Sequence, residues 1–475
     1  MGPQPDRAER PEVVNGANAS GKRQRSRGPD FQAENDLNIP GLPARKAAAK
    51  LLAAVIDAKT PLDGLTDHEH GHPQFRALDM RDRSLVRAIL VTALRFRVTT
   101  GKLIARRLER PLPGNAHSLS HLMHVAAAQI LFLDIPDSAA VDLAVTHAKS
   151  DPRTARFAGL VNGLLRGLAR AKNHQLPKML ASTDDAPDWF IERLTAAYGD
   201  DKAHAILAAH RTEAPVDFTV KSDPEGWAEK LGGIVLPTGT VRVEHLAANV
   251  ADLPGYQDGA WWVQDAAAAL PARLLGDVAG LRVADLCAAP GGKTAQLAMA
   301  GADVTAVDTS KNRLARLAVN LDRLGLRVEI VQADLLDYQP AELFDAVLLD
   351  APCSSTGTVR RHPDVPWTKS PEDVAKLAAL QRKLLDRALQ LVKPGGRLVF
   401  SNCSLDPLEG EALVEAMHET ALATLDPIVA GEIDGIAPFV TANGLLRTTP
   451  ADLDLGRPGI SGLDGFFAAR LRRAG

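Results

Sequence analysis

Cysteine is scarce in this 475-residue chain, which contains only Cys287, Cys353 and Cys403. An odd number of thiols without C-x-x-C spacing argues against a disulfide framework and a zinc site, and no metal site is expected. Long apolar runs are also missing, so the sequence predicts no membrane-spanning helix. Residues 1–13 lack the hydrophobic core of a secretory signal. These absences favour a protein of the cytoplasm, where thiols stay reduced.

The net charge of −3 conceals an asymmetry along the chain. Residues 41–175 carry 20 Lys and Arg against 11 Asp and Glu, whereas residues 1–40 are balanced. The remainder is therefore acidic. A basic segment on an acidic body suggests a polyanion partner for the N-terminal part, and a solvated basic surface is the alternative.

Three regions precede the C-terminal part of the chain. Residues 1–39 are rich in Pro, Gly, Asn and Arg and predict a disordered charged arm. Residues 40–175 show helical apolar spacing without strand alternation, which predicts an all-α domain. Its expected helices are 44–56, 84–96, 120–132, 139–148 and 156–168. Residues 176–260 mix helices with short strands and predict a small α+β linker subdomain.

In residues 261–475, strands alternate with helices. This rhythm predicts an α/β domain with a doubly wound parallel sheet of the Rossmann-like kind. An alanine-rich helix over 266–275 is expected before the first strand. The expected strands end at Asp285, Asp308, Asp334, Asp350 and Cys403, and the expected long helices are 310–324 and 372–391.

The stretch 283–294, VADLCAAPGGKT, is the centre of this domain. An apolar strand ends at Asp285, a Pro-Gly-Gly turn follows, and Lys293 and Thr294 open a helix. Such a turn presents backbone N–H groups to a ligand at the carboxyl edge of the first strand. The stretch matches neither G-x-G-x-x-G nor the Walker pattern. A tight turn without a ligand is the alternative.

Acidic residues close the next three strands. Asp308 lies 16 residues after Gly292, near the ~20-residue offset at which an acid binds ribose hydroxyls. Asp334 and Asp350 follow at the same edge of the sheet. A single acid there is commonly a helix cap, but three beside a Pro-Gly-Gly loop predict a nucleoside cleft.

All three cysteines follow expected strand ends at this edge. Buried structural cysteine is the ordinary alternative for each of them. Cys353 in DAPCSSTG and Cys403 in SNCS lie on polar loops beside the acids. Thiols in such places are candidate nucleophiles.

These motifs carry a resemblance to a known family. The region 261–475 resembles the RNA cytosine carbon-5 methyltransferases that use S-adenosylmethionine, through the motifs DLCAAPGGKT, AVDTSKNRL, FDAVLLDAPCSSTGTVRRHPDVPW, LVKPGGRLVFSNCS and GLDGFFAARL. The stretches DRSLVR, AAAQIL and FAGLVNGLLR in residues 40–175 are similar to the NusB fold, an RNA-binding helical module. From residue 40 onward the chain resembles the bacterial RsmB/Sun (Fmu) type, which methylates small-subunit ribosomal RNA. It departs from that type at Asn402, where Thr is common, and at 216–221, where Arg-x-Asn is common.

The resemblance implies a role for each candidate residue. Cys403 is the nucleophile that adds to carbon 6 of cytosine, Cys353 assists product release, and Asp350 contacts the base at the edge of the cofactor site. Asp308 binds the ribose of S-adenosylmethionine and Asp334 meets its adenine. The methionine part is held by the loop Cys287, Ala288, Ala289, Pro290, Gly291, Gly292 and Lys293. The implied substrate is 16S ribosomal RNA, and a monomer is expected.

Three other functions stay open at this point. Transfer RNA is an alternative substrate. A DNA cytosine or small-molecule methyltransferase is a second alternative, but DNA enzymes use the Pro-Cys thiol, so Cys403 and the basic front argue against it. An RNA-binding assembly factor with an inactive catalytic domain is the third, and the presence of Cys403, Cys353 and Asp350 argues against that.

Overall fold

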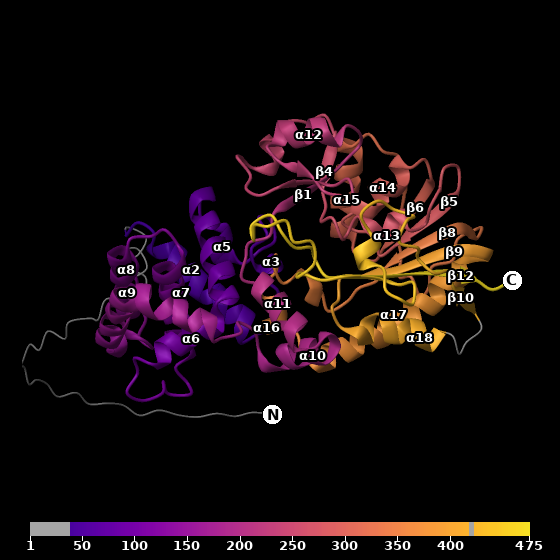
Figure 1. The fold of residues 1–475 in the computed structure, drawn as a ribbon. Helices are drawn as coiled ribbons and strands as arrows, with labels where there is room; N and C mark the ends of the chain where they lie inside the picture. Colours follow the sequence, from indigo (N-terminus) through magenta and orange to yellow (C-terminus); the bar gives the residue numbers. More distant parts are fainter. Residues whose placement is uncertain (1–38, 418–421) are drawn as a thin grey trace, which may run out of the picture.

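The structure is a computed structural model that describes residues 39–417 and 422–475. The charged arm expected at the N-terminus therefore lies, up to residue 38, outside the described residues. Figure 1 shows a helical front part and a sheet-containing C-terminal part, with α10, α11 and α16 between them. No helix in the described ranges is long and apolar enough to cross a membrane.

The front part is helical throughout, as the apolar spacing predicts. Its elements are α2 (Leu42–Ile56), α3 (Leu62–Leu65), α4 (Pro73–Arg76), α5 (Met80–Arg95), α6 (Arg97–Ala105), α7 (His117–Phe132), α8 (Asp137–Ser150), η1 (Ala155–Phe157) and α9 (Ala158–Ala181). Helix α7 lies at the centre, because its residues belong to two apolar clusters, one shared with α2 and α5 and one with α8 and α9. Between these clusters the buried Arg45 Nε donates to Gln129 Oε1 (2.9 Å).

A small antiparallel sheet follows two helices in the linker region. The elements are α10 (Asp188–Tyr198), α11 (Asp200–Ala209), β1 (Val216–Val220), α12 (Pro224–Leu231), β2 (Ile234–Val235), β3 (Val241–Val243), η2 (Val250–Asp252) and β4 (Trp261–Val263). The strand order is β2-β3-β1-β4. The expected boundary at residue 175 falls inside α9, and β4, placed in the next domain by the sequence, is the edge strand of this sheet.

The C-terminal part is the α/β domain expected from the strand–helix rhythm. Its elements are α13 (Leu270–Arg273), β5 (Arg282–Leu286), α14 (Gly292–Met299), β6 (Asp303–Asp308), α15 (Lys311–Arg323), β7 (Glu329–Gln332), β8 (Phe344–Asp350), η3 (Thr356–Thr358), α16 (Val365–Thr368), α17 (Pro371–Leu391), β9 (Val392–Asn402), η4 (Pro407–Glu409), α18 (Glu411–Met417), β10 (Ala423–Leu425), η5 (Ala437–Phe439), β11 (Leu446–Thr448) and β12 (Phe466–Arg473). The strand order is β10-β12-β9-β8-β5-β6-β7, with β11 paired to β12.

The five expected strands form the predicted parallel sheet, but the sheet extends beyond them. Strands β5 to β9 are parallel, but β12 is antiparallel to β9, β10 and β11. Antiparallel pairing requires no helical crossover, so the rhythm of strands and helices gave no sign of these last strands. Residues 466–471 are all buried and do not alternate with polar residues.

The expectation of an alanine-rich helix over 266–275 is wrong, since only α13 is helical there. Backbone N–H groups of this segment are bound by carboxylates instead: Ala266 N donates to Asp217 Oδ2 (2.9 Å) and Ala267 N to Asp265 Oδ1 (2.8 Å). Pro271 lacks an N–H and is therefore compatible only with the first turn of a helix.

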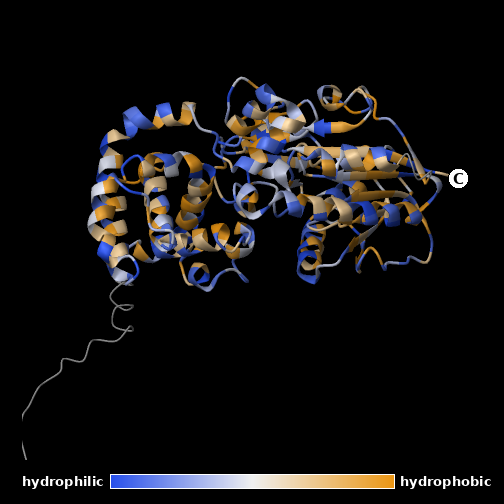
Figure 2. Ribbon diagram, turned by 90° about the horizontal axis from the view of Figure 1, so that it is seen from below, coloured by the Kyte–Doolittle hydropathy of each residue, from blue (hydrophilic) through white to orange (hydrophobic). Residues whose placement is uncertain are grey.

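Alternating side chains of the central strands face two different apolar layers. Leu286, Leu349 and Phe400 pack on one face beneath α17 and α18, whereas Leu348 and Val399 pack on the other against residues 266–278 and α14. In Figure 2 apolar residues gather on the strands and on the sides of the helices that face them. Both faces are covered, so loops at the carboxyl edge are the accessible part of this sheet.

The loop after β8 contacts the front part directly. Trp367 of α16 packs against the cluster of α2 and α5, and its Nε1 donates to Leu94 O (3.2 Å). Arg95 Nη2 donates to Arg360 O (2.8 Å), and Asp364 Oδ2 accepts from Leu62 N (2.9 Å). One end of this loop therefore lies on the helical front part, and its other end lies at the carboxyl edge of the sheet.

Trp367→Ala should lower the free energy of unfolding by about 2–4 kcal/mol, because an indole that bridges two domains is removed and leaves a cavity. Thermal unfolding of the full chain measures the loss. Trp367→Phe is the matched control, since it keeps an aromatic ring but removes the Nε1 donor, and it should lose less stability. Equal melting temperatures for the native and Trp367→Ala proteins would show that this indole does not hold the two parts together.

Candidate active site

A cleft of about 670 Å³ opens at the carboxyl ends of β5, β8 and β9. It is the crevice where α/β sheets bind ligands, beside the point at which strand order reverses between β5 and β8. The residues expected in the site that line it are Ala288, Pro290, Gly291, Gly292, Lys293, Asp350 and Cys403.

The glycine loop forms the wall of this cleft. Gly291 has φ +103°, and a Cβ there would lie 2.8 Å from Leu317 Cγ, so both conformation and space require glycine. Helix α14 begins at Gly292, directs its first N–H groups toward the loop and has no side-chain cap. These features fit the carboxylate end of an amino-acid-bearing cofactor.

Asp285 is a member of the site that the sequence marked only as a strand end. It is fully buried; its Oδ2 accepts from Thr294 Oγ1 (2.6 Å), and its Oδ1 has no partner in the described structure. Burial raises the pKa of Asp285 to about 7. Because Asp285 lines the cleft, its unpaired oxygen fits a ligand that brings a hydrogen-bond donor, such as the amino group of S-adenosylmethionine.

Asp308 and Asp334 lie in different environments. Asp308 is 4% exposed and is oriented by N–H groups of Ala289 (3.2 Å) and Ser310 (2.9 Å), so it lies directly behind the glycine loop. Asp334 is exposed, and its Oδ1 accepts from Leu336 N (2.9 Å) within its own turn. Neither acid lines the cleft itself. Their contacts with ribose and adenine remain predictions.

Asp350 is held at the floor of the cleft by two partners. Its Oδ2 pairs with Lys293 Nζ (2.8 Å), and its Oδ1 accepts from Ser401 Oγ (3.0 Å). Lys293 also lies over the ring of Phe466, 4.8 Å from its centroid. An acceptor and a cationic donor are thus fixed side by side, which suits a ligand edge that carries both a donor and an acceptor.

The two loop thiols are in contact, with Cys353 Sγ and Cys403 Sγ 3.5 Å apart. They come from adjacent parallel strands, β8 and β9. The contact between the two thiols lowers the pKa of Cys403, whereas the same contact and burial raise the pKa of Cys353. Burial raises the pKa of Cys287 to about 12, so this third thiol stays protonated. Cys403 is therefore the thiol most readily ionised, and it alone of the three lines the cleft.

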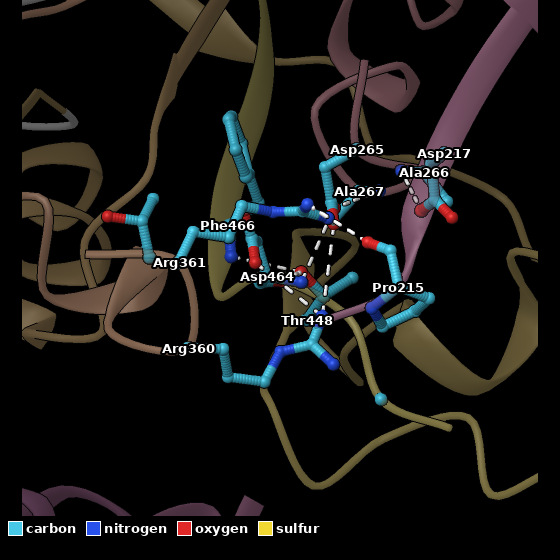
Figure 3. Close-up of polar contacts among 12 residues, drawn as sticks. Pro215, Asp217, Asp265, Ala266, Ala267, Arg360, Arg361, Thr448, Asp464 and Phe466 are labelled. Carbon is cyan, nitrogen blue, oxygen red and sulfur yellow. Dashed lines mark hydrogen bonds and ion pairs between the residues drawn. The ribbon is translucent and has the colours of Figure 1, made fainter. Parts of the chain in front are cut away.

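A charge network that the sequence did not reveal also lines the cleft. Figure 3 shows Arg361 between Asp265 and Asp464: its Nη2 lies 2.5 Å from Asp265 Oδ2, and its Nε lies 3.1 Å from Asp464 Oδ2. Arg360 approaches the same two carboxylates at 3.9 and 3.5 Å. Arg361 and Asp464 occur within motifs that carry the resemblance, but only the fold brings them together.

The sheet order, the glycine loop at the first strand and the acid behind it define a class I methyltransferase whose cofactor is S-adenosylmethionine. Family models place it further: residues 273–472 match the family described as 16S rRNA methyltransferase RsmB/F, and residues 42–170 match the NusB family. The chain belongs to the RsmB/F family of small-subunit ribosomal RNA methyltransferases.

Curated relatives and solved structures agree with this assignment. Ribosomal RNA small subunit methyltransferase B of Salmonella arizonae is 34% identical over 82% of this chain and 90% of its own length. The protein of the same name from Xylella fastidiosa is 37% identical over 91% of this chain and 98% of its own. Among solved structures, PH0851 is 23% identical, with a TM-score of 0.68, and the match covers 92% of this chain and all of PH0851. NSun6 from Pyrococcus horikoshii, solved with SFG, is 21% identical, with a TM-score of 0.51, and the match covers 61% of this chain and 98% of NSun6. The two structures establish the fold alone.

Asp308→Ala should weaken S-adenosylmethionine binding by about 1.5–3 kcal/mol, the scale of hydrogen bonds to charged groups. The effect combines loss of the predicted ribose contact with loss of the hydrogen bond from Ala289 N–H to Asp308, which orients the glycine loop. Isothermal calorimetry measures it. Asp303→Ala is the matched control, because Asp303 is an exposed acid at the other end of the same strand. Unchanged affinity in Asp308→Ala would remove Asp308 from the cofactor site.

Proposed function

We propose that this enzyme forms 5-methylcytosine in 16S ribosomal RNA through a covalent bond between Cys403 and carbon 6 of the base. The observation that carries the proposal is the pair of thiols 3.5 Å apart, beside the Asp350–Lys293 pair and the glycine loop. A methyltransferase that acts on a nucleophilic nitrogen or oxygen needs no thiol. Carbon 5 of cytosine is a poor nucleophile, so it must be activated first.

Each residue of the cleft then has a chemical task. The Cys403 thiolate donates an electron pair to carbon 6, which gives carbon 5 enamine character. S-adenosylmethionine, when bound, supplies an electrophilic methyl group to carbon 5. Asp350 and Lys293 hold the polar edge of the base as charge develops on the ring. They lie 2.8 Å apart, so they offer an acceptor and a donor to that edge together.

Release reverses the first bond. Carbon 5 gives its proton to solvent water, the electron pair of that C–H bond re-forms the ring double bond, and the Cys403 sulfur leaves carbon 6 as a thiolate. We assign Cys353 to this step because its Sγ contacts Cys403 Sγ and its pKa is raised, so it remains a neutral thiol beside the departing one.

We place the reaction in the cytoplasm, and we expect the enzyme to act as a monomer. Transfer RNA is the second candidate substrate, but the NusB-type front part and the small-subunit relatives favour ribosomal RNA.

The two cysteines should give opposite phenotypes. Cys403→Ala should reduce methylation by more than about 10⁴-fold, the scale for loss of a nucleophile. Cys353→Ala should stall after methyl transfer and leave the protein covalently joined to RNA. Denaturing gel electrophoresis with labelled RNA detects this adduct, which must also require the cofactor.

The double variant Cys353→Ala/Cys403→Ala is the control and should give no adduct. Trapping in Cys403→Ala with inactivity in Cys353→Ala would reverse the assignment and favour the DNA-type mechanism. Normal methylation by both single variants would exclude thiol catalysis.

We further propose that RNA backbone docks on the front part, along two adjoining hollows of about 480 and 320 Å³ between α2, α7 and the α8–η1 turn. The two hollows share Ser118 and residues 152–154. Lys46, Lys50, Arg153 and Arg156 line them against Asp57 and Asp151, so cations outnumber acids there. Such a surface attracts phosphates without reading sequence.

The triple variant Lys50→Ala/Arg153→Ala/Arg156→Ala should therefore bind substrate RNA more weakly. The slope of log affinity against log salt should fall by about 0.7–0.9 for each phosphate that the variant no longer neutralises. Fluorescence anisotropy across a salt series measures both. The matched control, Lys376→Ala/Lys383→Ala/Arg327→Ala, removes three exposed cations from the C-terminal part. The same slope for both triple variants would argue against the hollows as the docking surface.

A further inference from the structure

Behind the two thiols lies a carboxylate that the mechanism above does not use. Glu409 ends η4 and is 0% exposed. Its Oε1 accepts from Ser354 N (2.9 Å) and from Gln381 Nε2 (2.8 Å). Its Oε2 accepts from Ser404 Oγ (2.6 Å) and from Ser354 Oγ. Ser354 follows Cys353 and Ser404 follows Cys403, so one carboxylate holds the residues next to both thiols.

Asn402 closes the same network from the other side. Its Nδ2 donates to Glu409 O (2.6 Å), and its Oδ1 accepts from Ser404 N (2.9 Å). Gln381 of α17 adds a bond from its Nε2 to Pro352 O (3.0 Å). The asparagine that stands where the resemblance leads one to expect threonine thus ties η4 to the end of β9.

The surroundings of Glu409 supply hydrogen bonds rather than a counter-ion. Among the described residues its four donors are neutral, and the guanidinium of Arg193, whose pKa the charge of Glu409 helps to raise, is hydrogen-bonded to Asp406. A buried carboxylate without an ion pair is costly to retain for stability alone. Burial raises the pKa of Glu409, and the donors from Ser354 and Ser404 act in the opposite direction. The negative charge of the buried Glu409 carboxylate therefore acts on the thiols beside it.

We propose that Glu409 is a positioning residue that holds the Cys353 and Cys403 loops at thiol contact and favours Cys353 as the thiol that keeps the shared proton. This inference rests on the proposed thiol mechanism. The negative charge of Glu409 adds to the contact with Cys403 and to burial in raising the pKa of Cys353. The proton therefore stays on Cys353, which donates to Cys403 and leaves it the thiolate.

Other charged groups near the thiols act on Cys403. Asp350 and Lys293, from β8 and α14, face Cys403 and oppose each other, since they form an ion pair of 2.8 Å. Glu409 acts on Cys353. The contact between the thiols and burial are the larger causes of the raised pKa of Cys353, and Glu409, located outside the cleft, adds to them.

The test follows thiol ionisation in the full chain, without RNA or cofactor. Iodoacetamide labelling of Cys403 and Cys353 is measured by mass spectrometry from about pH 6 to about pH 10, a range that spans the ordinary thiol pKa. In the native protein Cys403 should be labelled at lower pH than Cys353. In E409Q, which keeps the size of the side chain and removes its charge, the Cys353 midpoint should fall by about one pH unit, a tenfold rise in thiolate.

Two further variants make the outcome decisive. E409D keeps the charge and should retain the high Cys353 midpoint, and E415Q removes the same charge from an exposed site on α18 and should behave as native. Equal midpoints in E409Q and the native protein, or the same shift in E409D as in E409Q, would overturn the inference. Because labelling needs no turnover, this result is independent of whether Cys403→Ala abolishes methylation.

Discussion

Arg361 is bound by two buried carboxylates, and the shape of the active site depends on these contacts. Asp265 follows the edge strand of the small sheet, Arg361 lies in the loop after β8, and Asp464 precedes β12. Removal of one member would leave an uncompensated buried charge, which is far more destabilising than the loss of a surface pair. Burial and the neighbouring arginines act in opposite directions on the two carboxylates. At Asp265 the charges of Arg361 and Arg360 outweigh burial, so its pKa is lowered. At Asp464 burial outweighs them, so its pKa is raised. Three segments distant in sequence are thereby fixed around one cleft.

The parts of the fold that follow from local patterns could be predicted from the sequence. Strands β5 to β9 and helices α15 and α17 are recognisable from their apolar spacing and from the strand–helix rhythm. Strand β12 is not, because it is buried on both faces and reached through irregular chain rather than a crossover helix. Residues 266–269 have strong helix formers, yet tertiary contacts with Asp217 and Asp265 override that propensity.

The site divides in a similar way. That the glycine loop, Asp350 and Cys403 lie at one cleft could be predicted, because all of them follow parallel strands. Whether Asp334 caps its own turn or binds a ligand cannot be read from a strand-end acid, and in the structure its Oδ1 accepts from Leu336 N. Glu409 and Arg361 could not be found from spacing, because their partners lie on other loops. Their roles arise only when β8 and β9 become neighbours.

The segment from η3 to the end of α16 contacts both the cleft and the helical front part. Arg361 and His362 line the cleft together with Cys403, and Trp367 of α16 packs against the apolar core of the helical front part. A shift of the front part would therefore also shift the residues of this segment that line the cleft. In evolutionary terms exchange of the NusB-type front part by recombination of genes is disfavoured, since a foreign module would have to supply a packing surface for this indole. We expect residues around Leu94 and Trp367 to be inherited together, as though the two domains were one.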